Sequence, residues 1–196
     1  RGPFRVSASG TGLAWRQRGT VQLGSRTHLR TDSLSIVVGD RELHATRPFA
    51  LTWIEQGFEL DSLRLAGSMG SVEAHGRVNR ERSELSVNAS LTPPEPPAWM
   101  GIPAGLVPSR LEARLEPTVG DSLLLKIDAH GLQVASHKDL DLRVVMIGRP
   151  EQILGSLVLT GGGDPLIEAT AVMPGRFSVL DSSAPTSDGP LQVDVR

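Results

Sequence analysis

The segment FELDSLRLAGSMGSVEAHGRV, residues 58–78, decides the fold because its residue types alternate strictly. Its second half places apolar or small residues at every second position, with charged or polar residues between them: Val72, Ala74, Gly76 and Val78 against Glu73, His75 and Arg77. Side chains of a strand point alternately to opposite faces of a sheet, so this pattern predicts a strand with one apolar and one polar face. Gly67 and Gly70 predict a tight turn before it.

The same alternation recurs along almost the whole chain. Phe49, Leu51 and Trp53 share one face of a predicted strand, and the segment SELSVNASL (83–91) alternates in the same way. Alternation resumes after residue 108 in RLEARLEP, SLLLKIDAHG and LDLRVVMIG. Glycine-rich turns separate these segments, so the sequence predicts an all-β, antiparallel meander of short strands, each of about 5–7 residues and 20 Å. The segment GRPEQILG (148–155) predicts at most one helical turn.

The alternation stops at TPPEPPAWMGIPAGLVP, residues 92–108, a segment that contains six of the 14 prolines. Proline cannot donate a ladder hydrogen bond, so neither a central strand nor a regular helix is expected here. Its apolar residues favour an ordered crossover over a solvated linker. The predicted organisation is a first meander unit (1–91), this crossover (92–108), and a second meander unit (109–196) that continues the same sheet.

Composition excludes several classes of protein. The 196 residues carry a formal charge of −2, and the 20 basic residues are spread along the chain without a basic stripe, so nucleic acid is not an expected partner. The absence of cysteine excludes disulfides, a thiol nucleophile and a thiolate zinc site. No apolar run reaches the roughly 20 residues that span a bilayer, and no signal-peptide pattern opens the chain. Its strand-like last segment, GPLQVDVR, suggests an excised piece of a longer protein.

No pattern of catalytic or metal-binding residues stands out. The five histidines are not spaced to gather ligands with carboxylates, and His75 and His130 fall on the polar faces of predicted strands. LTGGGDP (159–165) lacks the following Lys, Ser or Thr of a phosphate-binding loop, so a hairpin turn is expected. No serine lies in a G-x-S-x-G elbow. The sequence predicts no enzyme activity, no metal site and no cofactor.

The segment LRLAGSMGSVEAHGRVNRERSELSVNASL, residues 63–91, resembles the AsmA-like and TamB-like (translocation and assembly module) proteins of the bacterial cell envelope. In those proteins, a strand that ends in the pattern G-x-V is followed by a strand with the pattern x-L-x-V-x-A-x-L. The matching segments here are Gly76–Val78 and Leu85–Leu91. The similarity in the pattern of strands and turns extends over roughly residues 20–180. The resemblance implies a U-shaped sheet, the β-taco, with a continuous apolar concave face.

The resemblance also implies a function: conducting or holding phospholipid between the inner and outer membranes. The implied partners are phospholipid acyl chains, and the implied place is the periplasm, with membrane contact and anchoring through segments outside this chain. The side chains expected to line the lipid groove are the apolar members of the alternating segments: Leu63, Leu65, Val72, Ala74, Val78, Leu85, Val87, Leu91, Leu111, Leu115, Leu123, Leu125, Ile127, Leu140, Leu142 and Val144.

Two other functions fit the same pattern. An assembly or scaffold module would bind a strand of an outer-membrane barrel or secreted client protein by β-augmentation. A plain β-sandwich interaction domain would bury its apolar faces against each other. The low aromatic content of 4%, with no tyrosine, favours an open apolar surface over the thick core of a sandwich.

Overall fold

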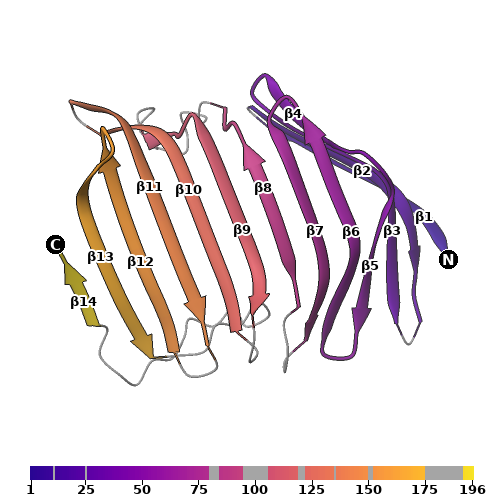
Figure 1. Ribbon diagram of the computed structural model, residues 1–196. Helices are drawn as coiled ribbons and strands as arrows, with labels where there is room; N and C mark the ends of the chain where they lie inside the picture. The colour runs from indigo at the N-terminus through magenta and orange to yellow at the C-terminus, as the bar shows by residue number, and fades with distance from the viewer. Residues whose placement is uncertain are drawn as a thin grey trace.

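The computed structural model describes residues 1–10, 12–24, 26–79, 84–94, 106–118, 122–134, 136–149, 152–174 and 192–196. These residues form one antiparallel sheet (Figure 1), whose strands are β1 (Gly2–Gly10), β2 (Leu13–Gln22), β3 (Thr27–Val38), β4 (Arg41–Ala45), β5 (Phe49–Ile54), β6 (Gly57–Gly67), β7 (Gly70–Asn79), β8 (Ser86–Leu91), β9 (Arg110–Thr118), β10 (Ser122–Val134), β11 (His137–Gly148), β12 (Gln152–Gly161), β13 (Asp164–Pro174) and β14 (Gln192–Val195). The predicted all-β antiparallel meander is confirmed. None of the described segments is a helix long and apolar enough to cross a membrane.

Each strand pairs with its neighbours in the sequence, except around β4 and β5. These two short strands occupy one position in the sheet, because both pair with β3 on one side and with β6 on the other. Pro48 lies between them and cannot donate a ladder hydrogen bond, which accounts for the interruption at residues 46–48. β4 and β5 therefore act together as one broken strand.

Two predictions about single segments had different outcomes. The hairpin at LTGGGDP is confirmed, since Gly162 and Gly163 form the turn between β12 and β13 with φ angles of 63° and 93°. The helical turn at 148–155 is wrong where the structure describes it, because Gly148 ends β11 and residues 152–155 begin β12. Residues 152–155 instead pair with β11 and β13 as part of the apolar segment that forms β12. These cross-strand hydrogen bonds outweigh the weak helix preference that the sequence GRPEQILG suggested.

Many strands are longer than the 5–7 residues predicted; β10, for example, has 13. The sequence suggested shorter strands because bulges and glycines break the apparent alternation without ending the strand. In β10 the register shifts between Ala129 and Leu132, at Gly131, yet pairing with β11 continues to Val134.

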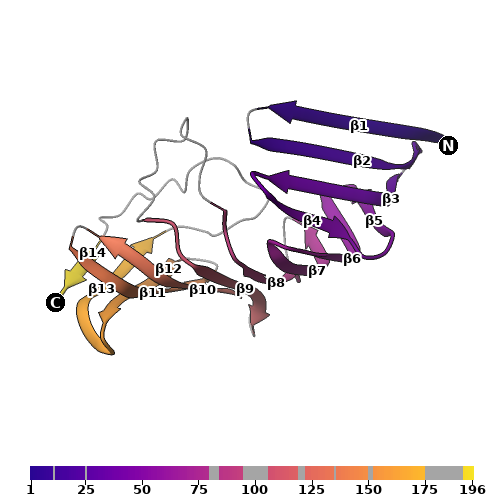
Figure 2. The same cartoon turned by 90° about the horizontal axis from the view of Figure 1, so that it is seen from above.

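Irregularities line up across the first half of the sheet. The register shifts between Arg18 and Gly19 where β2 meets β3, breaks between β4 and β5, and shifts again between Leu60 and Leu63 where β6 meets β7. Bulges bend a strand and increase its twist. In Figure 2 the sheet turns through β4–β7, and the strands β1–β3 and β9–β13 form two arms on either side of that bend.

The two arms do not make a closed sandwich in the described part of the chain. Substantial contacts between strands run only between hydrogen-bonded neighbours. One buried cluster, formed by Leu43, Leu65 and Met69, lies at the bend. A second, formed by Ala129, Leu132 and Leu140, lies in the arm of β9–β13. The core is thus distributed along the sheet, which differs from the single central core of a sandwich.

Thr31 is a fully buried polar residue on the apolar face of β3, beside Leu29. Its hydroxyl accepts a hydrogen bond of 2.7 Å from the Gln17 amide, so the two polar side chains satisfy each other. Thr31→Val is expected to lower the free energy of unfolding by about 1 kcal/mol, because the Gln17 amide loses its partner. In the double variant Gln17→Leu/Thr31→Val, which removes both groups, most of that loss should be recovered in urea denaturation. A stabilising single variant would contradict this account.

Candidate functional site: the apolar face of the sheet

A continuous row of apolar residues crosses the sheet from β4 to β14. Each member lies directly opposite the next one on the neighbouring strand: Ala45, Leu65, Val72, Ala89, Ala113, Ile127, Val144, Leu157, Ala169 and Val195. At about 4.8 Å per strand, this row runs for about 43 Å. We call the side that carries it the apolar face, and the opposite side the polar face.

Every residue that the sequence analysis assigned to a lipid groove lies on this apolar face. Their strand pairing places them side by side, for example Leu63 opposite Ala74, Val87 opposite Leu115, and Leu115 opposite Leu125. Leu85 directly precedes β8 and lies beside Gly76 of β7. Those that are buried are Leu65, Ala74, Val78, Leu85, Leu123 and Leu140. Those that are half-buried are Leu63, Val72, Val87, Leu91, Leu111, Leu115, Leu125, Ile127, Leu142 and Val144.

The two halves of the chain share this face without interruption. β8 pairs directly with β9, and Val87, Ala89 and Leu91 lie opposite Leu115, Ala113 and Leu111. This pairing supplies the register between the two predicted meander units that the Pro-rich segment obscured. The ordered crossover predicted at 92–108 falls mostly on residues 95–105, which lie outside the described residues.

The apolar face extends beyond the predicted residues at both ends. It includes Trp15 and Ile36 of the first arm and Leu43 of the bend. The predicted trio Phe49, Leu51 and Trp53 lies on the same face of β5, also at the bend, and pairs with Thr31, Leu29 and Thr27. In the second arm it continues through β12–β14. Exposed apolar side chains on this face are Val6 and Leu13 in the first arm, Trp53 at the bend, and Ile167, Val193 and Val195 in β13 and β14. The alternation that identified the central strands was present in these segments too.

The sequence predicted that the opposite face is polar, but part of it carries apolar side chains. A second apolar row crosses it in the arm of β10–β13, through Leu124, Ile147, Leu154 and Val172. The signal was the consecutive apolar residues in SLLLK and VVMIG. Two adjacent apolar residues in a strand must point to opposite faces, so such runs place apolar side chains on both sides of the sheet.

Several charged residues of the polar face form pairs of opposite sign. The Arg143 Nε donates to Asp128 at 2.6 Å, and this hydrogen bond and the charge of Asp128 raise the pKa of Arg143. Arg64 lies 3.5 Å from Glu73 on the neighbouring strand, and the Arg114 Nε lies 2.6 Å from Glu116. These pairs are largely exposed, so each contributes little to stability. Their regular placement fits a solvated surface.

The histidines also lie among these surface groups. His75 lies opposite Ser86, and the His130 Nδ1 is 3.2 Å from Asp141 on the same face. In the described parts of the chain, no three His, Cys, Asp or Glu side chains gather in a cluster that could hold a metal ion. The chemistry that this molecule offers over the largest area is therefore non-directional contact with an apolar ligand or partner.

Comparison of the chain with protein-family models, with curated proteins and with solved structures found no significant match.

Proposed function

We propose that the apolar face is the wall of a β-taco that holds or conducts phospholipid acyl chains. The observation that carries this proposal is the uninterrupted apolar row from β4 to β14, which contains no polar side chain. Leu, Val, Ile and Ala walls give an acyl chain a similar energy at each position along the row. An acyl chain gains about 0.8 kcal/mol for each CH₂ group removed from water, so holding it requires no directional contacts.

The bend through β4–β7 supports a concave form of this face. The buried apolar residues of this region, including Leu65, Ala74 and Val78, lie on the apolar face, while the polar face of the same strands carries exposed charges such as Glu73 and Arg77. A monomer rarely exposes an apolar surface of more than a few hundred Å², so a face of this extent favours a bound ligand. The protein would act as a segment of a cell-envelope lipid conduit with no catalytic residue and no cofactor.

Leu125→Asp is expected to remove most of the phospholipid that remains bound to the purified 196-residue chain, because it places a carboxylate at the half-buried centre of the apolar face, opposite Leu115 and Met146. Organic extraction and native mass spectrometry would measure the lipid bound per protein. Asn88→Asp adds the same charge at an exposed position of the polar face and should leave the lipid content unchanged.

A second variant tests the proposal without a buried charge. Val72→Thr/Val87→Thr/Val144→Thr keeps the side-chain shape and the strand preference, but makes three half-buried positions of the apolar face polar. Circular dichroism should match the parent protein, while bound lipid falls by about half or more. Full lipid retention in this folded variant, or a parent protein that carries no lipid after incubation with phospholipid vesicles, would refute the proposal.

A strand-binding assembly module is the second candidate, because β1 has a strand partner on only one side in the described sheet. Its other edge offers backbone groups along Gly2–Gly10 for β-augmentation by a client strand. Pro3 interrupts this edge near its start. Binding of an unstructured client peptide that persists in detergent and is lost in a Val6→Pro variant would favour this candidate over the lipid conduit.

A further inference from the structure

The arginines of the first strands form a charge imbalance. Residues 1–31 contain six arginines and no Lys, Asp or Glu, so they carry a formal charge of +6. The rest of the chain holds the other 14 basic residues and all 22 acidic ones, and therefore carries −8. The basic residues are spread along the chain as expected, but in residues 1–31 no acidic residue accompanies them.

Strand register gathers part of this charge on the polar face of β1–β4. Arg5 of β1 lies directly opposite Arg18 of β2, which lies opposite Ser33 of β3. One step along the strands, Arg16 lies opposite Ser7 and Ser35, and Ser35 lies opposite His44. Like charges directly opposite each other destabilise an antiparallel pair. The Arg5–Arg18 pairing is therefore unfavourable unless an anion lies close by.

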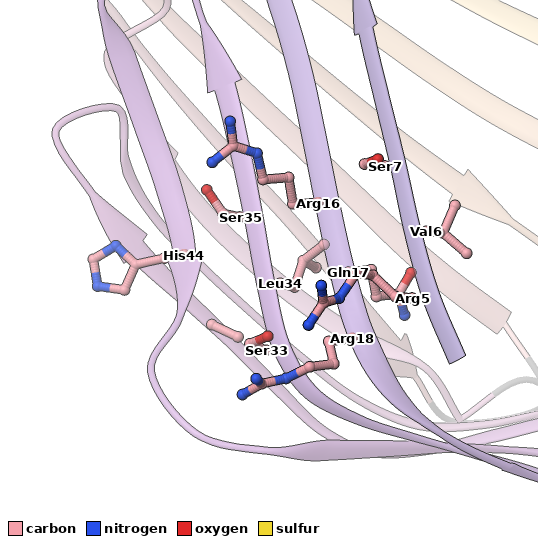
Figure 3. Close-up of a pocket in the computed structure, with 11 residues that line it drawn as sticks. Arg5, Val6, Ser7, Arg16, Gln17, Arg18, Ser33, Leu34, Ser35 and His44 are labelled. Atoms are coloured by element: carbon pink, nitrogen blue, oxygen red, sulfur yellow. The ribbon is translucent and has the colours of Figure 1, made fainter. Parts of the chain in front are cut away.

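These side chains line a hollow of about 610 Å³ on the polar face. The hollow also borders Val6, Gln17, Leu34 and Ala45, which alternate with them along the same strands and belong to the apolar face. Figure 3 shows the Arg16 and Arg18 side chains extending from β2 over β3, beside Ser35 and Ser33. No carboxylate lines the hollow among the described residues. We refer to Arg5, Arg16, Arg18, Ser7, Ser33, Ser35 and His44 as the basic hollow.

The arginines of the basic hollow differ from several others on the polar face. Arg64, Arg114 and Arg143 each have a carboxylate partner within 3.5 Å. Within the described ranges, Arg5, Arg16 and Arg18 have neither an ion pair nor a side-chain hydrogen bond. Carboxylate partners are thus present beside several arginines of this face and missing at the hollow.

We propose that the basic hollow binds a phosphate group. The planar guanidinium donates two parallel hydrogen bonds to a phosphate, and three such groups can surround its tetrahedral oxygens from two strands. The hydroxyls of Ser7, Ser33 and Ser35 add donors from the neighbouring positions. The phosphate belongs either to a lipid headgroup at a membrane surface or to a free phosphate compound. This site lies on the face opposite the apolar row and does not depend on the proposed lipid conduit.

The test compares two probes on the full 196-residue chain. Inorganic phosphate binding is followed by titration calorimetry, and vesicle binding by co-sedimentation with equal parts phosphatidylglycerol and phosphatidylcholine, against phosphatidylcholine alone. Arg16→Gln/Arg18→Gln is expected to weaken binding about tenfold or more, because each removed arginine takes away a charge-assisted hydrogen bond. Raising the salt from about 50 to about 500 mM should weaken vesicle binding in the parent protein. Binding of phosphate without vesicles identifies a free compound, and preferential vesicle binding identifies a headgroup.

Arg64→Gln/Arg114→Gln is the matched control, because it removes the same charge from paired arginines of the same face and should bind like the parent protein. The Arg16→Gln/Arg18→Gln variant should fold normally, since its arginines are exposed and one repulsive pairing is relieved. The proposal is overturned if neither probe binds, or if both double variants lose binding equally. It is also overturned if a poly-glutamate peptide or a DNA duplex binds more tightly than both probes.

Discussion

Val78→Asp is expected to lower the free energy of unfolding at pH 7 by about 3–5 kcal/mol. The Val78 side chain is 1% exposed on the apolar face of β7, opposite Phe58 of β6. A carboxylate there has no partner, and an unpaired buried charge costs about 3–5 kcal/mol. That loss is a large fraction of the free energy of unfolding of a domain, which is about 5–15 kcal/mol. Urea denaturation followed by circular dichroism would measure the shift of the midpoint.

The neighbouring residue provides the control for this prediction. Arg77→Ser changes an exposed side chain on the opposite face and should alter stability by no more than about 0.5 kcal/mol. Burial raises the pKa of the carboxyl introduced by Val78→Asp above its unfolded value, so the folded variant binds a proton more readily than the unfolded one. The deficit relative to the parent protein should therefore shrink as the pH falls through that raised pKa. A variant as stable as the parent at pH 7 would show that Val78 is not part of a closed core.

The second large effect is expected from Gly76→Ala in β7. Gly76 has a φ of +130°, which L residues rarely adopt, and a Cβ at this position would lie 2.1 Å from the backbone carbonyl oxygen of Glu84. Backbone atoms cannot move aside as a flexible side chain can, so β7 and the chain entering β8 must separate. We expect a loss of about 2–3 kcal/mol. For a chain of this size, that corresponds to a melting temperature lower by roughly 4–12 °C.

Gly155→Ala separates this geometric effect from a general effect of glycine replacement. Gly155 lies within β12, and the nearest atoms to a Cβ there, in Ala171, are 4.0 Å away. The variant should be neutral or up to about 1 kcal/mol more stable, because alanine restricts the unfolded chain. Equal destabilisation of both variants in differential scanning calorimetry would refute the close approach at Gly76.

Much of the fold follows from local alternation. Residues 72–78 predicted a two-faced strand, and β7 carries Val72, Ala74 and Val78 on one face as expected. This succeeded because the side-chain period of a strand is two, so the face of a residue depends only on its position within the strand. The same reasoning placed every predicted groove residue on the apolar face, although their role in lipid binding stays a prediction.

What alternation could not supply is register and curvature. The break at Pro48 and the bulges near Asp32 and Asp61 align only after β3–β7 have paired, so the bend has no signature within any one segment. The basic hollow was missed for the same reason. Arg5 and Arg18 are 13 positions apart in the sequence and become neighbours through the pairing of β1 with β2. A charge cluster formed across strands is invisible to a search for charge runs along the chain.

The up-and-down connectivity of the sheet has a consequence for how the chain folds. Apart from the pairing of β3 with β5 and β4 with β6, every strand finds its partner immediately before or after it in the sequence. Except for the connections from β8 to β9 and from β13 to β14, these contacts require only short loops to close. Topologies with such local pairings fold faster than sheets with distant pairings. Hairpins can form in order as the chain emerges, each offering an edge to the next. The sheet could then form strand by strand during synthesis, before the C-terminal strands have been made.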